Sequence, residues 1–372
     1  MGTVALASRS AIFPVTNHRS RRTVGVQTKS LRFLALSVIT FTPILATASP
    51  RAPQACTIAG GGVGQPSSIV CKDIATGDTT QSVPVAPVVS AAGGVGGNLV
   101  RHRDSVLVTN QHGGAVMFEE HAGRLTASTP LDTGGEDSLS GYLTDEGAYV
   151  VTPTRLLFFR HGARTATSSA PLLVGDGSAA QVVVTGHYAY VSEKSGSLEA
   201  FQLSGGGELA APATAVAGVT PGVIVGIAKA GRLVVAPIAH LASNPAQAAI
   251  SVVGRTSQLQ HIDTKETAAC WAKGAGDAVC VTNPGSMTVS CGHAGDDALA
   301  SFTEIATTTT GASGFDLDLR DDLVAIQATA AGHPMLLIYS REEHSDFLDE
   351  VGRISIDATA ATGALLLPPL GH

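Results

Sequence analysis

The chain has 372 residues, of which 44% are hydrophobic and 14% charged, and its formal net charge is −7. Such a chain is long enough to bury a large core and too apolar to be disordered. After Arg51 the chain is acidic and has no cluster of Lys and Arg, which makes it poorly suited to bind nucleic acid or an anionic membrane, so we expect neither partner. Its 42 glycines and abundant Ser, Thr and Val favour an all-β fold with many tight turns.

The N-terminus has the composition of an export signal. Residues 1–48 carry six basic residues and no acidic one. An apolar run from Phe33 to Leu45 follows the basic part and ends in the small residues Ala46-Thr47-Ala48. This order indicates a cleaved signal peptide. A membrane anchor is the alternative, although the run is shorter than the roughly 20 residues of a spanning helix and contains Pro43.

Removal of this segment takes away six positive charges and leaves a formal charge of −13 on the mature part. We expect residues 49–372 to form one secreted, monomeric domain.

The five cysteines fit an oxidising compartment. Cys56 and Cys71 lie near the start of the mature domain, where they would close a loop. If the turns after Cys270 and Cys280 centre near residue 275 and between residues 285 and 286, Cys280 lies opposite both Cys270 and Cys291. One cross-strand disulfide would then form and one thiol would stay free, but the sequence leaves the pairing open. The spacings do not match a zinc ribbon.

A pattern of two strands recurs along the chain. In each copy an apolar strand ending near Thr, Ser or Asn leads through a turn to an alternating strand that ends in Phe or a similar residue. The copies begin 41 to 45 residues apart, at Val106, Ala148, Ala189, Leu233, Ala278 and Leu323. A degenerate copy from Thr57 to Ile74 would make seven.

A repeat of this length with about four short strands is typical of a β-propeller. A pair of β-sandwiches would lack the fixed repeat, and the coils of a β-solenoid would be shorter. The sequence therefore predicts an all-β propeller, with seven blades of four antiparallel strands. Six or eight blades remain open because the first copy is weak.

A further short strand precedes most copies and would be the innermost strand of its blade. These strands are predicted at Ser138–Leu143, Gln181–Val184, Val223–Ile227, Thr267–Trp271 and Gly314–Leu319. Residues at their entrances should line the central channel, where propellers usually bind ligands.

Several segments resemble the lactonase family of seven-bladed propellers, which includes 6-phosphogluconolactonase and fungal 3-carboxymuconate cyclase. They are Thr267-Ala-Ala-Cys-Trp271 followed by Ala278–Asn283, Gln181-Val-Val-Val184 followed by Ala189–Lys194, Thr109-Asn110, and Gly123-Arg124-Leu125-Thr126. The resemblance covers roughly residues 95 to 340. It implies the propeller fold and activity on a small lactone.

The resemblance does not extend to the catalytic residues. Family members place histidine, with arginine and glutamate, near the entrances of inner strands. The entrances in this chain contain no histidine and read Glu136-Asp137-Ser138, Ala179-Ala180-Gln181, Thr220-Pro221-Gly222 and Ala268-Ala269-Cys270. No catalytic residue is therefore transferred from the family.

Three acidic residues are the catalytic candidates. Glu193 ends a strand beside Lys194 and would be a general base at the channel mouth, or else part of a solvated charge pair. Asp316, Asp318 and Arg320 alternate along one face of an inner strand. The two aspartates would point into the channel and hold a sugar or a cation, or else cap neighbouring backbone amides.

The ligand-binding candidates are Gln181, Trp271 and Asn283. The face of Trp271 would pack on a sugar ring, Gln181 stands at an inner-strand entrance, and Asn283 ends the following strand of the Trp271 hairpin. Cys270 would need a nearby base to act as a nucleophile, and the sequence supplies none, which favours core packing or a disulfide. No metal-binding or cofactor-binding motif is present in the sequence, so we expect neither a metal nor a cofactor.

These observations predict a secreted propeller that acts on a small lactone or sugar acid, as a hydrolase or as a cyclase or isomerase. The alternative is a non-catalytic extracellular propeller that binds carbohydrate or protein.

Overall fold

The computed structural model describes residues 52–60, 62–90, 96–216, 222–239, 249–253, 259–263, 266–293, 306–341 and 348–369. The predicted signal peptide lies outside these residues. Within them the chain forms 28 strands, which pair into seven four-stranded antiparallel sheets. Among the described residues, no helix is long and apolar enough to cross a membrane.

Six sheets are built from four strands that are consecutive in the sequence. The first consists of β4 (Leu99–His102), β5 (Ser105–Val108), β6 (Ala115–His121) and β7 (Arg124–Leu131). The second consists of β8 (Ser140–Leu143), β9 (Gly147–Val151), β10 (Arg155–Arg160) and β11 (Ser168–Pro171). The third consists of β12 (Ala179–Thr185), β13 (Tyr188–Glu193), β14 (Ser197–Gln202) and β15 (Thr214–Ala215).

The next three sheets repeat this arrangement. One consists of β16 (Ala228–Ala230), β17 (Leu233–Ile238), β18 (Ala249–Val253) and β19 (Leu259–Asp263). Another consists of β20 (Trp271–Ala275), β21 (Ala278–Asn283), β22 (Thr288–His293) and β23 (Ala306–Thr309). The last consists of β24 (Ser313–Arg320), β25 (Leu323–Ala330), β26 (His333–Arg341) and β27 (Leu348–Ser355).

The seventh sheet joins the two ends of the domain. Its order is β28 (Ala360–Leu367), β1 (Gln54–Gly60), β2 (Ser67–Asp73) and β3 (Thr79–Val85). The C-terminal strand is thus the innermost strand of the N-terminal sheet. The weak first copy of the repeat is real, because its residues form most of β1 and β2.

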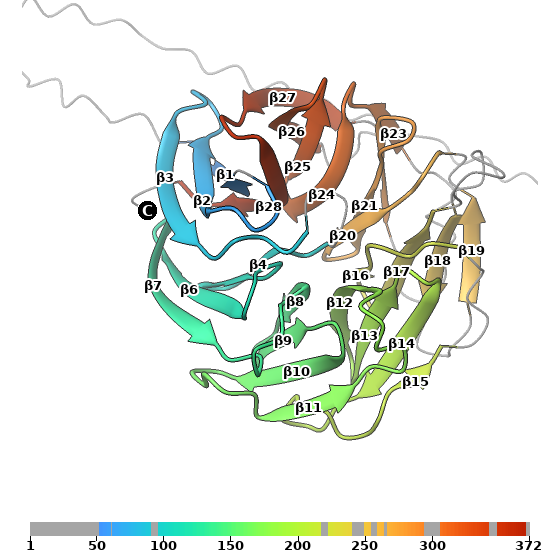
Figure 1. The fold of residues 1–372 in the computed structure, drawn as a ribbon. Helices are drawn as coiled ribbons and strands as arrows, with labels where there is room; N and C mark the ends of the chain where they lie inside the picture. The colour runs from blue at the N-terminus through green and yellow to red at the C-terminus, as the bar shows by residue number, and fades with distance from the viewer. Residues whose placement is uncertain are drawn as a thin grey trace, which may run out of the picture. The chain divides into compact units, whose positions relative to one another are not determined.

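The innermost strands form a closed ring (Figure 1). Contacts run from β4 to β8, β12, β16, β20, β24 and β28 in turn, and β28 contacts β4 again. This arrangement confirms the predicted β-propeller, and its seven sheets agree with the seven copies of the repeat.

The core lies between successive sheets. Tyr149 and Phe158 of one sheet pack with Val182, Val191 and Phe201 of the next. Every residue of β9 and β21 is buried, because both faces of these strands are covered. This two-sided burial explains the near-continuous apolar runs in the sequence.

The hairpin of β20 and β21 differs from the prediction. Ala268 has a φ of 58°, and β20 begins only at Trp271, where the predicted strand ends. The tight turn is formed by Gly276 and Asp277, since Ala275 pairs with Ala278. Similarly, β16 starts after the predicted Val223–Ile227 strand, at Ala228.

The register of this hairpin decides the cysteine geometry. Cys280 pairs with Lys273 on β20 and with Cys291 on β22, so the prediction that it also lies opposite Cys270 is wrong. Cys280 and Cys291 form a disulfide and Cys270 is free and buried. One pair and one free thiol are as predicted.

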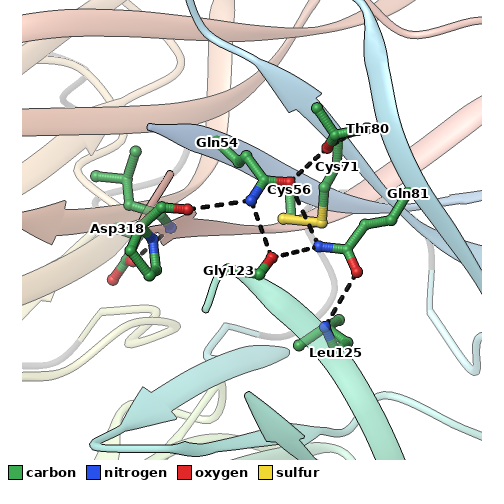
Figure 2. Close-up of a disulfide and its surroundings, with 10 residues drawn as sticks. Gln54, Cys56, Cys71, Thr80, Gln81, Gly123, Leu125 and Asp318 are labelled. Atoms are coloured by element: carbon green, nitrogen blue, oxygen red, sulfur yellow. Dashed lines mark hydrogen bonds between the residues drawn. A yellow bond between two sulfur atoms is a disulfide. The ribbon is translucent and has the colours of Figure 1, made fainter. Parts of the chain in front are cut away.

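The second disulfide joins Cys56 to Cys71 across β1 and β2 (Figure 2). Beside it lies a hydrogen-bonded group that we call the glutamine bridge, formed by Gln54, Gln81 and Gly123. Gln54 Nε2 donates to Gly123 O at 2.9 Å and to Pro368 O at 3.0 Å, and Gln81 Nε2 donates to Gly123 O at 2.8 Å. The bridge therefore ties the N-terminal sheet and the end of β28 to the β6–β7 turn.

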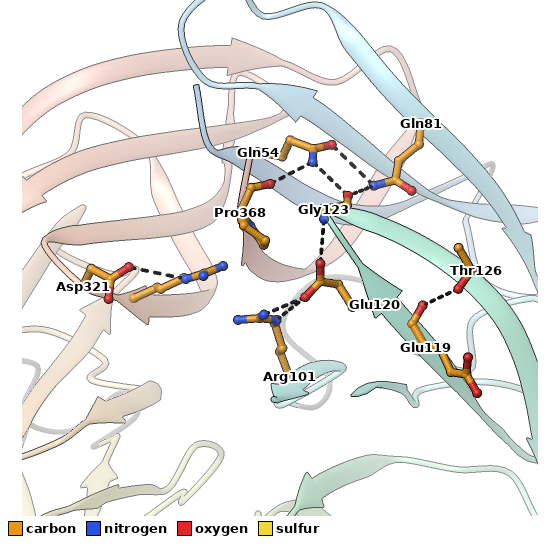
Figure 3. A network of polar contacts seen from close by, with 10 residues as sticks. Gln54, Gln81, Arg101, Glu119, Glu120, Gly123, Thr126, Asp321 and Pro368 are labelled. Atoms are coloured by element: carbon orange, nitrogen blue, oxygen red, sulfur yellow. Dashed lines mark hydrogen bonds and ion pairs between the residues drawn. The ribbon is translucent and has the colours of Figure 1, made fainter. Parts of the chain in front are cut away.

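The same turn is held from the other side by an ion pair (Figure 3). Glu120 accepts a hydrogen bond from Gly123 N at 2.6 Å and pairs with Arg101 Nη2, also at 2.6 Å. The carbonyl of Gly123 thus joins two sheets, while its N–H is held by Glu120 within its own sheet.

Candidate functional site: a carboxylate and lysine cluster on the inner strands

Two neighbouring inner strands, β20 and β24, bring a lysine to a pair of aspartates. Lys273 Nζ lies 3.4 Å from Asp318 Oδ1. Asp318 Oδ2 accepts a hydrogen bond from Leu366 N of β28 at 2.9 Å. Asp318 is therefore held between the inner strands of the two sheets that flank its own.

Asp316 lies on the same face of β24, as the alternation predicts. The register pairs Asp316 with Gln327 and Asp318 with Ala325 without a break between them. Asp316 Oδ1 accepts a hydrogen bond from Leu317 N at 2.9 Å, and the backbone N–H of Asn98 also donates to this carboxyl group. Asp316 thus reaches the segment that leads into β4.

The environment of Asp316 favours its protonated form. Burial raises the pKa of Asp316 to about 7, although Lys273 and the two backbone N–H groups act to lower it and Asp318 raises it further. The side chain can therefore hold or release a proton near neutral pH.

Arg320, the third residue of the alternation, does not join this cluster. Its Nε lies 3.4 Å from Asp321 Oδ2 at the end of β24. The cluster consists of Lys273, Asp316 and Asp318.

The segment Gly96–Asn98 contacts residues of several sheets. Gly96 N donates to Ala180 O of β12 at 3.4 Å, and Asn98 Nδ2 donates to Thr362 Oγ1 of β28 at 2.7 Å. A Cβ on Gly96 would lie 2.7 Å from Gln181 Oε1 and 3.0 Å from Trp271 Cδ1. Two of the predicted ligand-binding residues therefore meet at this segment, next to Asp316.

Gln181 and Trp271 differ in how their polar groups are satisfied. Gln181 Oε1 accepts a hydrogen bond from Ile227 N at 3.0 Å. Trp271 is 3% exposed and packs edge-on against Phe315, with ring centroids 5.6 Å apart. Its Nε1–H is buried and has no hydrogen-bond partner within the described structure.

Glu193 lies apart from this cluster, at the end of β13. Its Oε2 accepts a hydrogen bond from Ser178 Oγ at 2.7 Å. Burial raises the pKa of Glu193 to about 8, Ser178 opposes the shift, and Glu199 and Asp176 add to it. Because Glu193 is fully buried, the solvated charge pair considered as an alternative is wrong.

Asn283 and Cys270 have local roles in their sheet. Asn283 Nδ2 donates to Thr288 Oγ1 and Ser290 Oγ, which commits the amide to the β21–β22 hairpin. Burial raises the pKa of the Cys270 thiol to about 12, so it is not a thiolate at neutral pH. Cys270 therefore behaves as the packed residue that was the alternative to a nucleophile.

The sequence interpretation missed Lys273 and Asn98. A turn centred near residue 275 leaves Lys273 beside the bend, whereas the observed turn at Gly276-Asp277 puts Lys273 within β20, on the same strand face as Trp271. Nothing in the sequence indicates that Asn98 approaches Asp316. Across the ranges that the structure describes, no three His, Cys, Asp or Glu side chains are grouped to hold a metal ion.

Solved structures with a similar fold include two bacterial proteins. The putative 6-phosphogluconolactonase of Bacteroides fragilis aligns over 87% of this chain and 99% of its own, with 12% identity and a TM-score of 0.58. The putative 6-phosphogluconolactonase of Bacteroides uniformis aligns over 85% of this chain and 100% of its own, with 12% identity and a TM-score of 0.57.

A third similar structure is the computationally designed Ika8 protein, with 11% identity, a TM-score of 0.51 and coverage of 82% and 96% of the two chains. No protein-family model matches the sequence, and no curated protein matches it. At these identities the likeness concerns the fold. The protein is a β-propeller, and its fold resembles that of lactonase-like propellers.

Proposed function

We propose that the protein is a secreted propeller enzyme that hydrolyses a small lactone or a related sugar-acid ester at the inner strands. The observation that carries this proposal is the pairing of Asp316, which can hold a proton near neutral pH, with Asp318, which is ion-paired to Lys273. A general acid and a general base on one strand face can together catalyse the hydrolysis of an ester.

The two aspartates take different parts in the proposed reaction. Residues two apart on a strand are separated by roughly 7 Å, which leaves room for a water molecule and the ester group. Asp318 accepts a proton from the water as its oxygen bonds to the carbonyl carbon. Asp316 gives its proton to the ring oxygen as the carbon–oxygen bond of the lactone breaks.

Lys273 and Asn98 support these two groups. The Lys273 ammonium lies beside Asp318 and favours negative charge on the reacting oxygen. The backbone N–H of Asn98 orients the Asp316 carboxyl. Asn98 is itself fixed through Thr362, so this orientation depends on β28.

Two further observations support the proposal. Both Bacteroides proteins with this fold are named as putative lactonases. The two disulfides are compatible with an extracellular protein.

A panel of aldonolactones, assayed for hydrolysis with the purified protein, tests the proposal. We expect turnover above the uncatalysed rate, and a loss of about 100-fold or more in Asp316→Asn and in Asp318→Asn, the usual range for a general acid or base. Glu193→Gln is the matched control, because it removes a buried carboxyl group outside the cluster and should retain activity. Absence of turnover across the whole panel would refute the proposed lactone hydrolysis. Activity that survives both aspartate substitutions would refute the proposed catalytic roles of Asp316 and Asp318.

The second candidate is a non-catalytic propeller that binds a carbohydrate or a protein outside the cell. It is favoured by the low exposure of Asp316, which is 6%, and by the absence of histidine at the inner-strand entrances. Binding of a sugar without hydrolysis of any lactone would support it.

A further inference from the structure

The charges around the central cluster are already balanced. Lys273 is the cation of this cluster and lowers the pKa of Asp316, and Asp318 is the other anion and raises it. Lys273 is committed to Asp318 at 3.4 Å. The cluster therefore carries no net charge when Asp316 is protonated, and a charge of −1 when it is ionised.

A ligand anion would find no free positive charge in this cluster. A phosphate or carboxylate brought to Lys273 would have to compete with Asp318, which is 9% exposed and anchored to Leu366 N. Burial strengthens such competition, because charges in a low-dielectric site are screened weakly.

The buried donor of Trp271 points to the kind of group that the site accepts. Trp271 and Lys273 are two residues apart on β20 and share one strand face, just as Asp316 and Asp318 do on β24. The Trp271 Nε1–H is buried without a partner, and leaving such a donor unpaired is unfavourable by about 1–3 kcal/mol. Any oxygen acceptor would satisfy this donor, and a hydroxyl or lactone oxygen would do so without adding a charge to a cluster that is already neutral.

We propose that the central site recognises a neutral, hydroxyl-bearing ligand, and that Asp318 enforces this preference by neutralising Lys273. This inference rests on the proposed function, since it concerns the same site, and it defines the substrate class as uncharged lactones of polyhydroxylated acids. The same ion pair disfavours phosphorylated and carboxylated analogues.

Trp271 gives a direct readout, because it is the one tryptophan of the chain. The probes are glucono-1,5-lactam and its 6-phosphate, which differ by one phosphate group and are not hydrolysed. Fluorescence titration of the purified protein should show that the neutral lactam binds at least about ten-fold more tightly than the phosphate. Equal or tighter binding of the phosphate overturns the inference, and so does binding of neither compound.

The Asp318→Asn variant tests the cause of the preference. It leaves the Lys273 charge uncompensated, so the affinity ratio should shift by at least about ten-fold toward the phosphorylated lactam. Asp321→Asn is the control, since it removes a carboxylate that is 85% exposed and is paired with Arg320, and it should leave the ratio unchanged. An unchanged ratio in folded Asp318→Asn overturns the role of Asp318.

A second variant covers the case in which Asp318→Asn does not fold. Lys273→Gln removes the cation instead, and it should weaken binding of the phosphorylated lactam by a larger factor than binding of the neutral lactam. Improved phosphate binding in this variant contradicts the inference. Since the lactams report binding alone, failure of lactone hydrolysis would refute the proposed enzyme without affecting this result.

Discussion

Asp316 and Asp318 share one face of β24, yet they have different surroundings. Asp318 has a lysine and a backbone N–H from two neighbouring sheets, whereas Asp316 is buried against the Gly96–Asn98 segment. A carboxyl group whose pKa is raised on folding binds its proton more tightly in the folded state than in the unfolded state. Its contribution to stability is therefore complete at low pH and is lost as the pH rises.

This difference predicts a pH dependence of stability. The pKa of Asp316 is about 7 when folded and about 3.9 when unfolded, so the free energy of unfolding should fall between about pH 4 and pH 7. Asp316→Asn should remove most of this pH dependence. The change in the free energy of unfolding that it removes amounts to a few kcal/mol at most. Denaturant titrations at pH 4 to 8 measure the effect.

Glu193→Gln gives the control for this measurement. The pKa of Glu193 is raised to about 8, so its contribution should be lost over a range that extends about one pH unit further. An Asp316→Asn variant with the same pH slope as the natural protein would show that Asp316 is ionised throughout.

The Gly96–Asn98 segment makes a second prediction at the residue scale. In Gly96→Ala the new Cβ would press on Gln181 Oε1, which is hydrogen-bonded to Ile227 N, and on Trp271. We expect a loss of about 1–3 kcal/mol in stability and a shift in Trp271 fluorescence. A variant with natural stability and an unchanged spectrum would contradict this close approach.

Much of this residue-scale information cannot be predicted from local sequence patterns. Strand alternation places Asp316 and Asp318 on one face, because that relation is local. The approach of Lys273 and Asn98 depends on how separate sheets meet around the ring, and no local pattern encodes it. Glu193 illustrates the same limit, since it is completely buried although the sequence places it at the end of a strand beside Lys194.

At the scale of elements, the β20–β21 hairpin shows how a small error in the predicted position of a turn changes which residues pair across the strands. Moving the centre of the turn from residue 275 to the Gly276-Asp277 pair replaces Cys270 with Lys273 as the partner of Cys280. The β21–β22 turn was centred correctly between residues 285 and 286, and there the predicted opposition of Cys280 and Cys291 is confirmed.

The glutamine bridge gives a prediction at the same scale. A Cβ on Gly123 would lie 2.6 Å from Pro368 O and 2.8 Å from Gln54 Nε2, and Gly123 has a φ of 78°. Gly123→Ala should therefore lose about 1–2 kcal/mol to backbone strain and a further 1–3 kcal/mol to the separation of the two sheets. Thermal unfolding measures the sum.

Gly113→Ala separates these two effects. Gly113 has a φ of 71° but open space around its Cα, so Gly113→Ala should lose only the stability that backbone strain accounts for. If the two variants lose equal stability, the close packing of the glutamine bridge contributes nothing.

At the scale of the whole molecule, the repeat predicted the propeller because each blade is a local unit of known length. The interval of 41 to 45 residues in the sequence corresponds to one four-stranded sheet each time. The role of β28 was not predicted. Its pairing with β1 joins residues about 300 positions apart, as in the hydrogen bond from Thr57 to Thr362.

Removal of β28 should therefore affect the entire ring. A chain ending at Ser355 would expose the edge of β1 and lose the hydrogen bonds of Leu366 and Thr362 with Asp318 and Asn98. We expect aggregation or rapid proteolysis, measured against a control chain ending at Pro369, which keeps every strand. A stable, monomeric truncated protein would show that the ring holds without its closing strand.

The position of β28 also bears on how the protein is made. Synthesis produces β1, β2 and β3 first and their innermost partner last, so this sheet is incomplete for as long as the chain is growing. During that time the β1 edge is open to other chains, including other nascent copies. Cys56 and Cys71 are only 15 residues apart, and their disulfide can form before β28 exists. In the exported protein that we propose, early oxidation would thus hold the β1–β2 hairpin in register until β28 has been synthesised.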